Sequence, residues 1–148
     1  AVNNPRLITD LANKFGSQSV VAQIDVKNYH NEYIIFINSG RDITKYKLKE
    51  WIKCVQDYGA GEILITSIDK DGMSRGADYE LLEIVKECCN VPFIYGGGIQ
   101  GDDEIEKLFK KNITNLTLAS SLHHNEVDIS KTKEILSSKG FLIRSNNQ

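Results

Sequence analysis

The feature that most constrains the fold of this chain is a fourfold alternation of short apolar runs with amphipathic segments. The apolar runs lie at residues 20–25, 63–66, 93–95 and 116–119. Segments with apolar residues at helical spacing lie at residues 48–55, 81–88, 102–109 and 130–138. Short β-branched runs are typical of buried strands, and their alternation with helices predicts right-handed βαβ units around a parallel sheet. The chain is therefore expected to be an α/β protein.

Two more segments complete the expected organisation. Residues 5–16 read as a helix that ends at Gly16, with Ile8, Leu11 and Phe15 on one buried stripe. The run at residues 33–37 follows a short polar connection, so we expect it to be a hairpin arm beside the first strand. Since no linker rich in Pro, Gly or Ser divides the chain, we expect a single domain.

Composition excludes several classes of function. The 148 residues carry 18 Lys and Arg against 20 Asp and Glu, a net charge of −2, which argues against a nucleic-acid partner. No apolar run approaches the roughly 20 residues of a membrane span, and the start lacks a signal-peptide pattern, so we expect a cytoplasmic protein. Cys54, Cys88 and Cys89 are odd in number and form no Cys-x-x-Cys pair, so we expect no disulfide framework, metal or cofactor.

Glycines and hydroxyls follow the last two predicted strands. Parallel α/β proteins bind ligands at the carboxyl ends of their strands. Residues 96–98 are three glycines between a strand and a helix, and Ser120 and Ser121 follow the next strand. Consecutive loops of this kind favour a phosphate site, because free amides at a helix start bind anions. The alternative is that the glycines serve only the backbone conformation of the turn.

Acidic residues occur at three places near the ends of the predicted strands. Asp25 follows the first strand, where burial can raise a carboxyl pKa toward a range useful for proton transfer. Its alternative role is a helix cap or an ion pair with Lys27. The loop that holds Asp69 and Asp71 lacks the spacing of a calcium loop and reads as a solvated tip. Glu62 lies at the opposite end of its strand, where an isolated glutamate reads as an ion-pair partner.

Several motifs taken together resemble a known family. They are residues 15–18, 24–27, the Gly-Ala-Gly-Glu to Asp-Lys-Asp-Gly stretch at 59–72, and the glycine pair at 97–98. With these motifs the chain resembles the cyclase subunit of imidazole glycerol phosphate synthase over nearly its whole length. The resemblance implies half of a (β/α)8 TIM barrel with a small β-hairpin insertion. Residues 1–148 would form a single C-terminal half-barrel, units 5–8 of the family.

The resemblance also implies an activity, site residues and partners. In this family, ammonia from a glutaminase subunit converts a phosphoribosyl-formimino carboxamide ribonucleotide into imidazole glycerol phosphate and an aminoimidazole carboxamide ribonucleotide. Asp25 matches the second of two catalytic aspartates. The positions that match substrate contacts are Thr66, Asp71 and Gly72. Those that match the phosphate site are Gly97, Gly98 and Ser121, and Glu62 matches the ammonia gate.

Some positions depart from the family pattern. Gln23 replaces a small or apolar strand residue, and His123 stands where an aromatic is usual. Tyr95 and Gly96 precede the glycine pair in place of a Ser or Ala, and Ile99 and Gln100 follow it in place of Ala-Gly. We expect these changes to alter one wall of the phosphate site. Such departures occur in paralogues that supply ammonia for amidation of bacterial surface sugars, and this remains the alternative function.

The family's first catalytic aspartate and its other phosphate site belong to the first four βα units, which these 148 residues do not include. We therefore expect the chain alone to bind phosphate weakly and to be inactive. Four strands cannot close a barrel, so exposed edges and apolar surface would remain. A further alternative is thus a half-barrel module that self-associates as a homo-oligomer.

Overall fold

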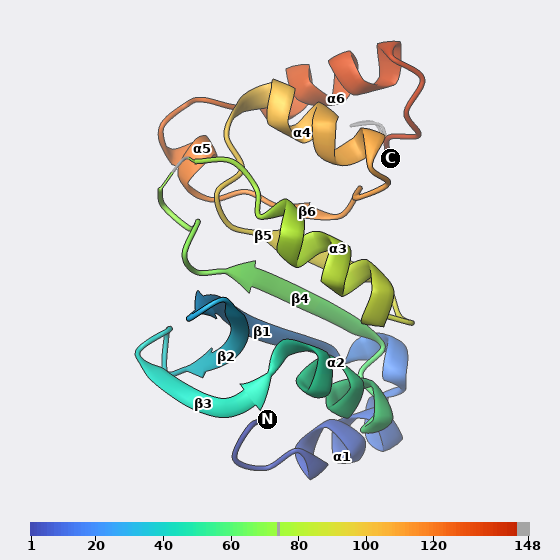
Figure 1. Cartoon of the computed structure of the whole chain (residues 1–148). Helices are drawn as coiled ribbons and strands as arrows, with labels where there is room; N and C mark the ends of the chain where they lie inside the picture. The colour runs from blue at the N-terminus through green and yellow to red at the C-terminus, as the bar shows by residue number, and fades with distance from the viewer. Residues whose placement is uncertain (74, 145–148) are drawn as a thin grey trace.

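The structure, a computed structural model, describes residues 1–73 and 75–144 and contains one six-stranded mixed sheet (Figure 1). The strand order is β3-β2-β1-β4-β5-β6. The parallel strands are β1 (Val21–Tyr29), β4 (Glu62–Ser67), β5 (Phe93–Gly96) and β6 (Leu116–Thr117). The antiparallel strands are β2 (Glu32–Ile37) and β3 (Asp42–Lys47), which extend the sheet beyond β1. The predicted α/β class and the hairpin insertion are confirmed.

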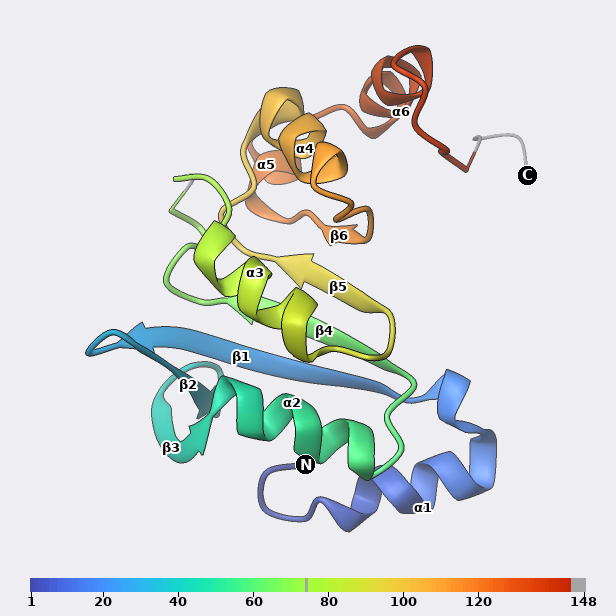
Figure 2. The ribbon, with the colours of Figure 1, turned by 45° about the vertical axis from the view of Figure 1, so that its right-hand side comes forward.

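Helices precede, connect and follow the parallel strands. In chain order they are α1 (Arg6–Phe15), the 3-10 helix η1 (Ser17–Ser19), α2 (Leu48–Asp57), α3 (Tyr79–Cys88), α4 (Gly101–Lys110), α5 (Ser120–His123) and α6 (Ile129–Ser138). Two views place α2 and α3 on the same side of the sheet (Figures 1 and 2). Four strand-and-helix units in sequence, all parallel, form the arrangement of half a β/α barrel. None of the helices in the described ranges combines the length and apolar character needed to cross a membrane.

Strand register gives the sheet two different faces. Ile24 pairs with Ile65, and Ile65 pairs with Tyr95, so these buried side chains share the face that α2 and α3 cover. One residue further along, Asp25 pairs with Thr66. Because side chains alternate along a strand, the Asp25 row belongs to the opposite face. We call this second face, which carries Gln23, Asp25, Leu64, Thr66 and Thr117, the open face.

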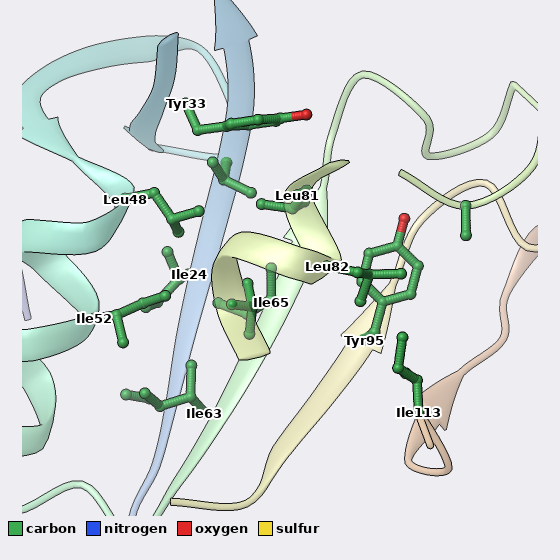
Figure 3. Close-up of a cluster of buried hydrophobic side chains, with 14 of the residues drawn as sticks. Ile24, Tyr33, Leu48, Ile52, Ile63, Ile65, Leu81, Leu82, Tyr95 and Ile113 are labelled. Atoms are coloured by element: carbon green, nitrogen blue, oxygen red, sulfur yellow. The ribbon is translucent and has the colours of Figure 1, made fainter. Parts of the chain in front are cut away.

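The hydrophobic core lies between the sheet and α2 and α3. Figure 3 shows Ile24, Ile63 and Ile65 facing helix residues such as Ile52 and Leu82. All five side chains are at most 1% exposed. Burying an aliphatic side chain of this size contributes about 1.5–3 kcal/mol, so this layer fixes which face of each strand turns away from it.

Three predicted features differ from the structure. Strand β1 runs to Tyr29 rather than ending at Asp25, because pairing with β2 extends it. Strand β3 was not predicted, since its side chains are half-buried or exposed and form no apolar run. The buried stripe on α1 was wrong beyond Ile8: Leu11 is 37% exposed and Phe15 is 55% exposed, because no described segment covers that side of the helix.

We expect Leu81→Ala to lower the free energy of unfolding by about 3 kcal/mol, because truncating a buried leucine removes apolar burial and leaves a cavity. Leu81 is 0% exposed on α3. The matched control is Leu11→Ala on α1, where the expected loss is about 1 kcal/mol or less. Urea unfolding followed by circular dichroism measures both. Equal losses would contradict the assignment of the core to the α2 and α3 side.

Candidate functional site

One row of the open face brings the predicted site strands together at the carboxyl edge of the sheet. Asp25, Thr66, Gly96 and Thr117 are consecutive partners across β1, β4, β5 and β6. Gly96 has no side chain to place in this row, and a Cβ there would lie 2.3 Å from the Thr117 Oγ1. The row therefore presents a carboxylate and two hydroxyls along one line of the sheet.

A cavity of about 280 Å³ opens beside this row, and we call it the Thr66 cavity. Five of the residues predicted to contact substrate or phosphate line it: Thr66, Asp71, Gly72, Gly97 and Gly98. They come from β4, from the loop that follows it, and from the turn after β5. Folding thus gathers positions up to 32 residues apart around a space large enough for a small phosphorylated group.

The glycine turn packs closely against the end of β4 and the loop that follows it. A Cβ on Gly97, whose φ is +106°, would lie 2.5 Å from the Ser67 carbonyl oxygen. A Cβ on Gly98, whose φ is +77°, would lie 2.4 Å from the Gly76 carbonyl oxygen. Any larger residue would force the two loops apart. These contacts require glycine at both positions whether or not a ligand binds, and the same two residues line the Thr66 cavity.

The two aspartates of the loop after β4 have different surroundings. The Asp69 carboxylate accepts a hydrogen bond of 2.7 Å from the Asn28 N–H and lies 3.6 Å from the Lys27 Nζ. Asp71 lines the Thr66 cavity and is exposed. Asp69 thus ties the loop to the end of β1, which leaves Asp71 to face the cavity. Lys27 pairs with Asp69 rather than with Asp25, so the ion-pair alternative for Asp25 does not apply.

Asp25 lines a separate cavity of about 390 Å³, beside Phe36 and Asn38 of the hairpin. Gln23 lines both this cavity and the Thr66 cavity. Its Nε2 donates a hydrogen bond of 3.1 Å to the Asp25 Oδ1. Sequence reasoning noted Gln23 only as a departure from the family. The available signal was a polar side chain inside an apolar strand, two residues from Asp25 and hence on the same face.

Two predicted wall residues lie elsewhere. Ser121 is 2% exposed and does not line the Thr66 cavity, whereas Ser120 does. The Ser121 backbone carbonyl accepts the N–H groups of Glu126 and Val127 as the chain turns back after α5. Of the four residues expected to alter a wall of the site, Gly96 and Ile99 line the cavity, whereas the Tyr95 side chain lies on the covered face. Strand alternation explains this difference.

Tyr95 takes part in a buried hydrogen-bond network. Its hydroxyl accepts the Asp78 N–H at 2.8 Å and donates to the Gly97 carbonyl oxygen at 2.9 Å. The Asp78 Oδ1 accepts from the Tyr33 hydroxyl at 2.8 Å and from the Leu81 N–H at 3.0 Å. Asp78 therefore caps α3 and also joins the hairpin to the loops around the cavity. Burial raises the pKa of Tyr95 to about 12, so its hydroxyl stays protonated at neutral pH.

Glu62 lies at the amino edge of the sheet. It begins β4, and Leu64 and Thr66 follow it on the open face. At about 3.3 Å per residue, about 13 Å separate Glu62 from Thr66 along the strand. Within residues 1–73 and 75–144 its carboxylate has no hydrogen-bond or ion-pair partner, and no cluster of three or more His, Cys, Asp or Glu residues could hold a metal. Cys54, Cys88 and Cys89 are free thiols.

These features define a class of protein. Parallel βα units carry a ligand-sized cavity at their carboxyl edge. The cavity is bounded by the glycine turn (residues 96–98) and by the acidic loop after β4 that holds Asp69 and Asp71, as in β/α-barrel proteins that bind small molecules. A family model described as "Histidine biosynthesis protein" matches residues 1–128. The chain belongs to this family, and the resemblance found in the sequence is confirmed.

Individual relatives agree with this assignment. Imidazole glycerol phosphate synthase subunit HisF of Chlorobium phaeobacteroides is 40% identical over 145 residues, which are 97% of this chain and 58% of the relative. The corresponding subunit of Chlorobaculum parvum is 41% identical over the same shares. That of a Thermotoga species is 39% identical over 144 residues, 97% of this chain and 57% of the relative. The chain thus spans a little over half the length of these relatives.

We expect Gly97→Ala to destabilise the fold by about 3 kcal/mol or more, because it adds an unfavourable φ to a backbone overlap. The control is Gly101→Ala, where φ is also positive (+66°) but no atom lies within 4 Å of the added Cβ. Its expected loss is about 1 kcal/mol. Chemical unfolding of both variants gives the comparison. Equal losses of unfolding free energy in the two variants would contradict the close contact between Gly97 and the Ser67 carbonyl.

Proposed function

We propose that this chain forms the C-terminal part of the cyclase subunit of an imidazole glycerol phosphate synthase. The single observation that carries the proposal is the shared cavity: Thr66, Asp71, Gly72, Gly97 and Gly98 meet there. The 40% sequence identity to the HisF subunit of Chlorobium phaeobacteroides supports it. In this role the protein acts as a lyase in histidine biosynthesis and requires no cofactor.

The substrate carries phosphate groups and sugar hydroxyls, and these two kinds of group suit different walls of the Thr66 cavity. The glycine turn at 96–98 lines the cavity and offers backbone N–H groups to a phosphate. The Asp71 carboxylate would repel a phosphate placed beside it, so it suits a sugar hydroxyl, which can donate a hydrogen bond. Thr66 lies between these walls and Asp25. We infer that a phosphorylated ribonucleotide lies with its phosphate on the glycine turn and its reacting end toward Asp25.

Asp25 is proposed as a general acid and base. Its carboxylate lines an open cavity, and its hydrogen bond from Gln23 leaves the second oxygen available to a substrate. Positioned proton transfer contributes about 10²- to 10⁴-fold to a rate. The cyclase reaction needs a second such group, which we place on the preceding βα units of the family. Units 5–8 are then residues 1–148, and this chain alone is expected to be inactive.

Glu62 is proposed as part of an ammonia gate. It lies on the same strand and the same face as Thr66, at the opposite edge of the sheet. A small neutral molecule entering beside Glu62 would move along the open face toward Thr66 and Asp25. The proposed source of ammonia is a glutaminase subunit that docks at the amino edge of the strands.

We expect Asp25→Asn to lower cyclase turnover by about 10²-fold or more in the complete enzyme, because it removes the group that transfers the proton. The assay supplies the ribonucleotide with ammonium salt and follows imidazole glycerol phosphate. The control is Asp57→Asn, since the Asp57 carboxylate pairs with Lys53 on the outer surface of α2.

Two results would contradict this proposal. The first is undiminished turnover by Asp25→Asn. The second is turnover by the 148-residue chain alone, which would show that no second carboxylate is needed. An enzyme that binds phosphate in the Thr66 cavity but never converts the ribonucleotide would favour the alternative, ammonia supply for amidation of a surface sugar.

Exposed apolar surface favours a second role, self-association of the half-barrel. Val21 is 48% exposed at the start of β1, although it lies in a strand beside the core. Leu64 on the open face is only half-buried. We propose that two copies of the chain associate so that the open face of each, which carries Val21 and Leu64, covers that of the other, as the halves of a barrel would.

We expect the chain to sediment as a dimer or larger species at micromolar concentration, and Val21→Lys to shift it toward monomer by placing a charge in the apolar contact. Met73→Lys serves as the control, because Met73 is equally exposed at 48% but lies in the loop after β4. Analytical ultracentrifugation measures the masses. A monomeric wild-type chain would exclude this role.

A further inference from the structure

Tyr95 connects the two loops that wall the Thr66 cavity, although it lies outside the cavity itself. It is 0% exposed on the covered face of β5. In Figure 3 its ring lies beside Leu82, and its hydroxyl points away from Ile113. That hydroxyl bonds the Asp78 N–H on one side and the Gly97 carbonyl on the other. One side chain thus fixes the end of the acidic loop and the glycine turn together.

The bond to Gly97 has a consequence for the next residue. A trans peptide unit is planar, so the Gly97 carbonyl and the Gly98 N–H point in opposite directions. The carbonyl is held toward Tyr95 and the core. The Gly98 N–H therefore points away from the core, and Gly98 lines the Thr66 cavity. No acceptor for this N–H lies among the described residues 1–73 and 75–144.

We propose that Tyr95 is a positioning residue for anion binding: its hydroxyl holds the Gly97 carbonyl toward the core and thereby aims the Gly98 N–H at a phosphate oxygen in the Thr66 cavity. This inference rests on the proposed function for the identity of the ligand. The inference adds a role for Tyr95. Glycine residues allow the Gly97–Gly98 peptide more than one orientation, and the buried Tyr95 side chain selects one of them.

The rest of the network supports the same conclusion. Asp78 could not hold Tyr95 in place if its own position varied, and it is fixed by the Tyr33 hydroxyl and the Leu81 N–H. Glu104 fixes the adjacent peptide by accepting the Ala77 N–H at 2.7 Å. The Tyr95 hydroxyl is thus anchored at a rigid point, and its protonated state at neutral pH keeps it a donor to Gly97.

The test compares Tyr95→Phe with Tyr79→Phe. Both remove a hydroxyl that donates to an acceptor, but the Tyr79 hydroxyl bonds Glu104 and does not contact Gly97. Titration with inorganic phosphate, followed at the Gly98 amide by NMR, gives the dissociation constant. Losing one N–H directed at a charged oxygen weakens binding by about tenfold or more, so we expect that change for Tyr95→Phe. We expect less than about a twofold change for Tyr79→Phe.

A second measurement separates this proposal from the proposed function. Residual dipolar couplings report the orientation of the Gly98 N–H whether or not phosphate binds. We expect this coupling to change in Tyr95→Phe and to stay constant in Tyr79→Phe. An unchanged coupling, or unchanged phosphate affinity in a folded Tyr95→Phe, overturns the positioning role. A changed coupling without phosphate binding by the wild type supports the positioning role and overturns the phosphate site.

If Tyr95→Phe does not fold, a crystal structure of the wild-type chain soaked in phosphate decides the question. The expected result is a Tyr95 hydroxyl on the Gly97 carbonyl oxygen and a phosphate oxygen within hydrogen-bond distance of the Gly98 nitrogen. A Gly97 carbonyl directed into the Thr66 cavity overturns the proposal.

Discussion

Strands β1 and β4 each bury alternate side chains under α2 and α3, and the arrangement of the site depends on this alternation. A slip of one residue in β1 would expose Ile24 and bury Asp25, and the same slip in β4 would expose Ile65 and bury Thr66. Each exposed isoleucine would cost about 1.5–3 kcal/mol. The core therefore keeps Asp25 and Thr66 side by side on the open face, although neither residue contributes to the core. The same alternation places Glu62 on that face at the other edge.

Loops at the carboxyl edge lack such a repeating constraint, and buried polar side chains hold them instead. Asp78 and Tyr95 connect the hairpin, the loop after β4 and the glycine turn. Within the described ranges, no buried side-chain nitrogen or oxygen lacks a hydrogen-bond partner. A fully paired network of this kind is rigid, because breaking any bond leaves a polar group without water or partner. The cavity is therefore formed before any ligand arrives.

Sequence reasoning succeeded where a local pattern decides the structure. The apolar runs became strands, although the run at 116–119 forms only the short strand Leu116–Thr117, and the hairpin arm was placed correctly. It failed where burial depends on distant segments. Leu11 and Phe15 have the spacing of a buried stripe, but spacing alone does not supply a surface to cover them. Strand β3 gave no apolar signal because it lies at the edge of the sheet.

The candidate site divides in the same way. The glycine turn was located from residues next to one another in the sequence, whereas Asp71 and Gly72 of the acidic loop were assigned through the family resemblance. Both segments line the Thr66 cavity. The contributions of Gln23 and Tyr95 follow from the face on which each lies. For Gln23 the available signal was its position two residues from Asp25, whereas for Tyr95 the face depends on the register between strands, which a short apolar run does not encode. Ser121 was predicted at the cavity, but Ser120 lines it. The reason is related, since the start of α5 decides which serine faces the cavity.

Glycine at positions 97 and 98 is required by packing, so its presence does not by itself indicate a ligand. Any protein in which these loops approached so closely would need glycine there, whether or not it bound an anion. What distinguishes a binding turn from a merely tight one is the direction of its N–H groups, because an anion is bound by those groups and repelled by carbonyl oxygens. The Tyr95 hydroxyl settles that direction for one peptide by attracting its carbonyl to the core. The specific evidence for an anion site therefore lies in a tyrosine outside the cavity rather than in the glycines that line it.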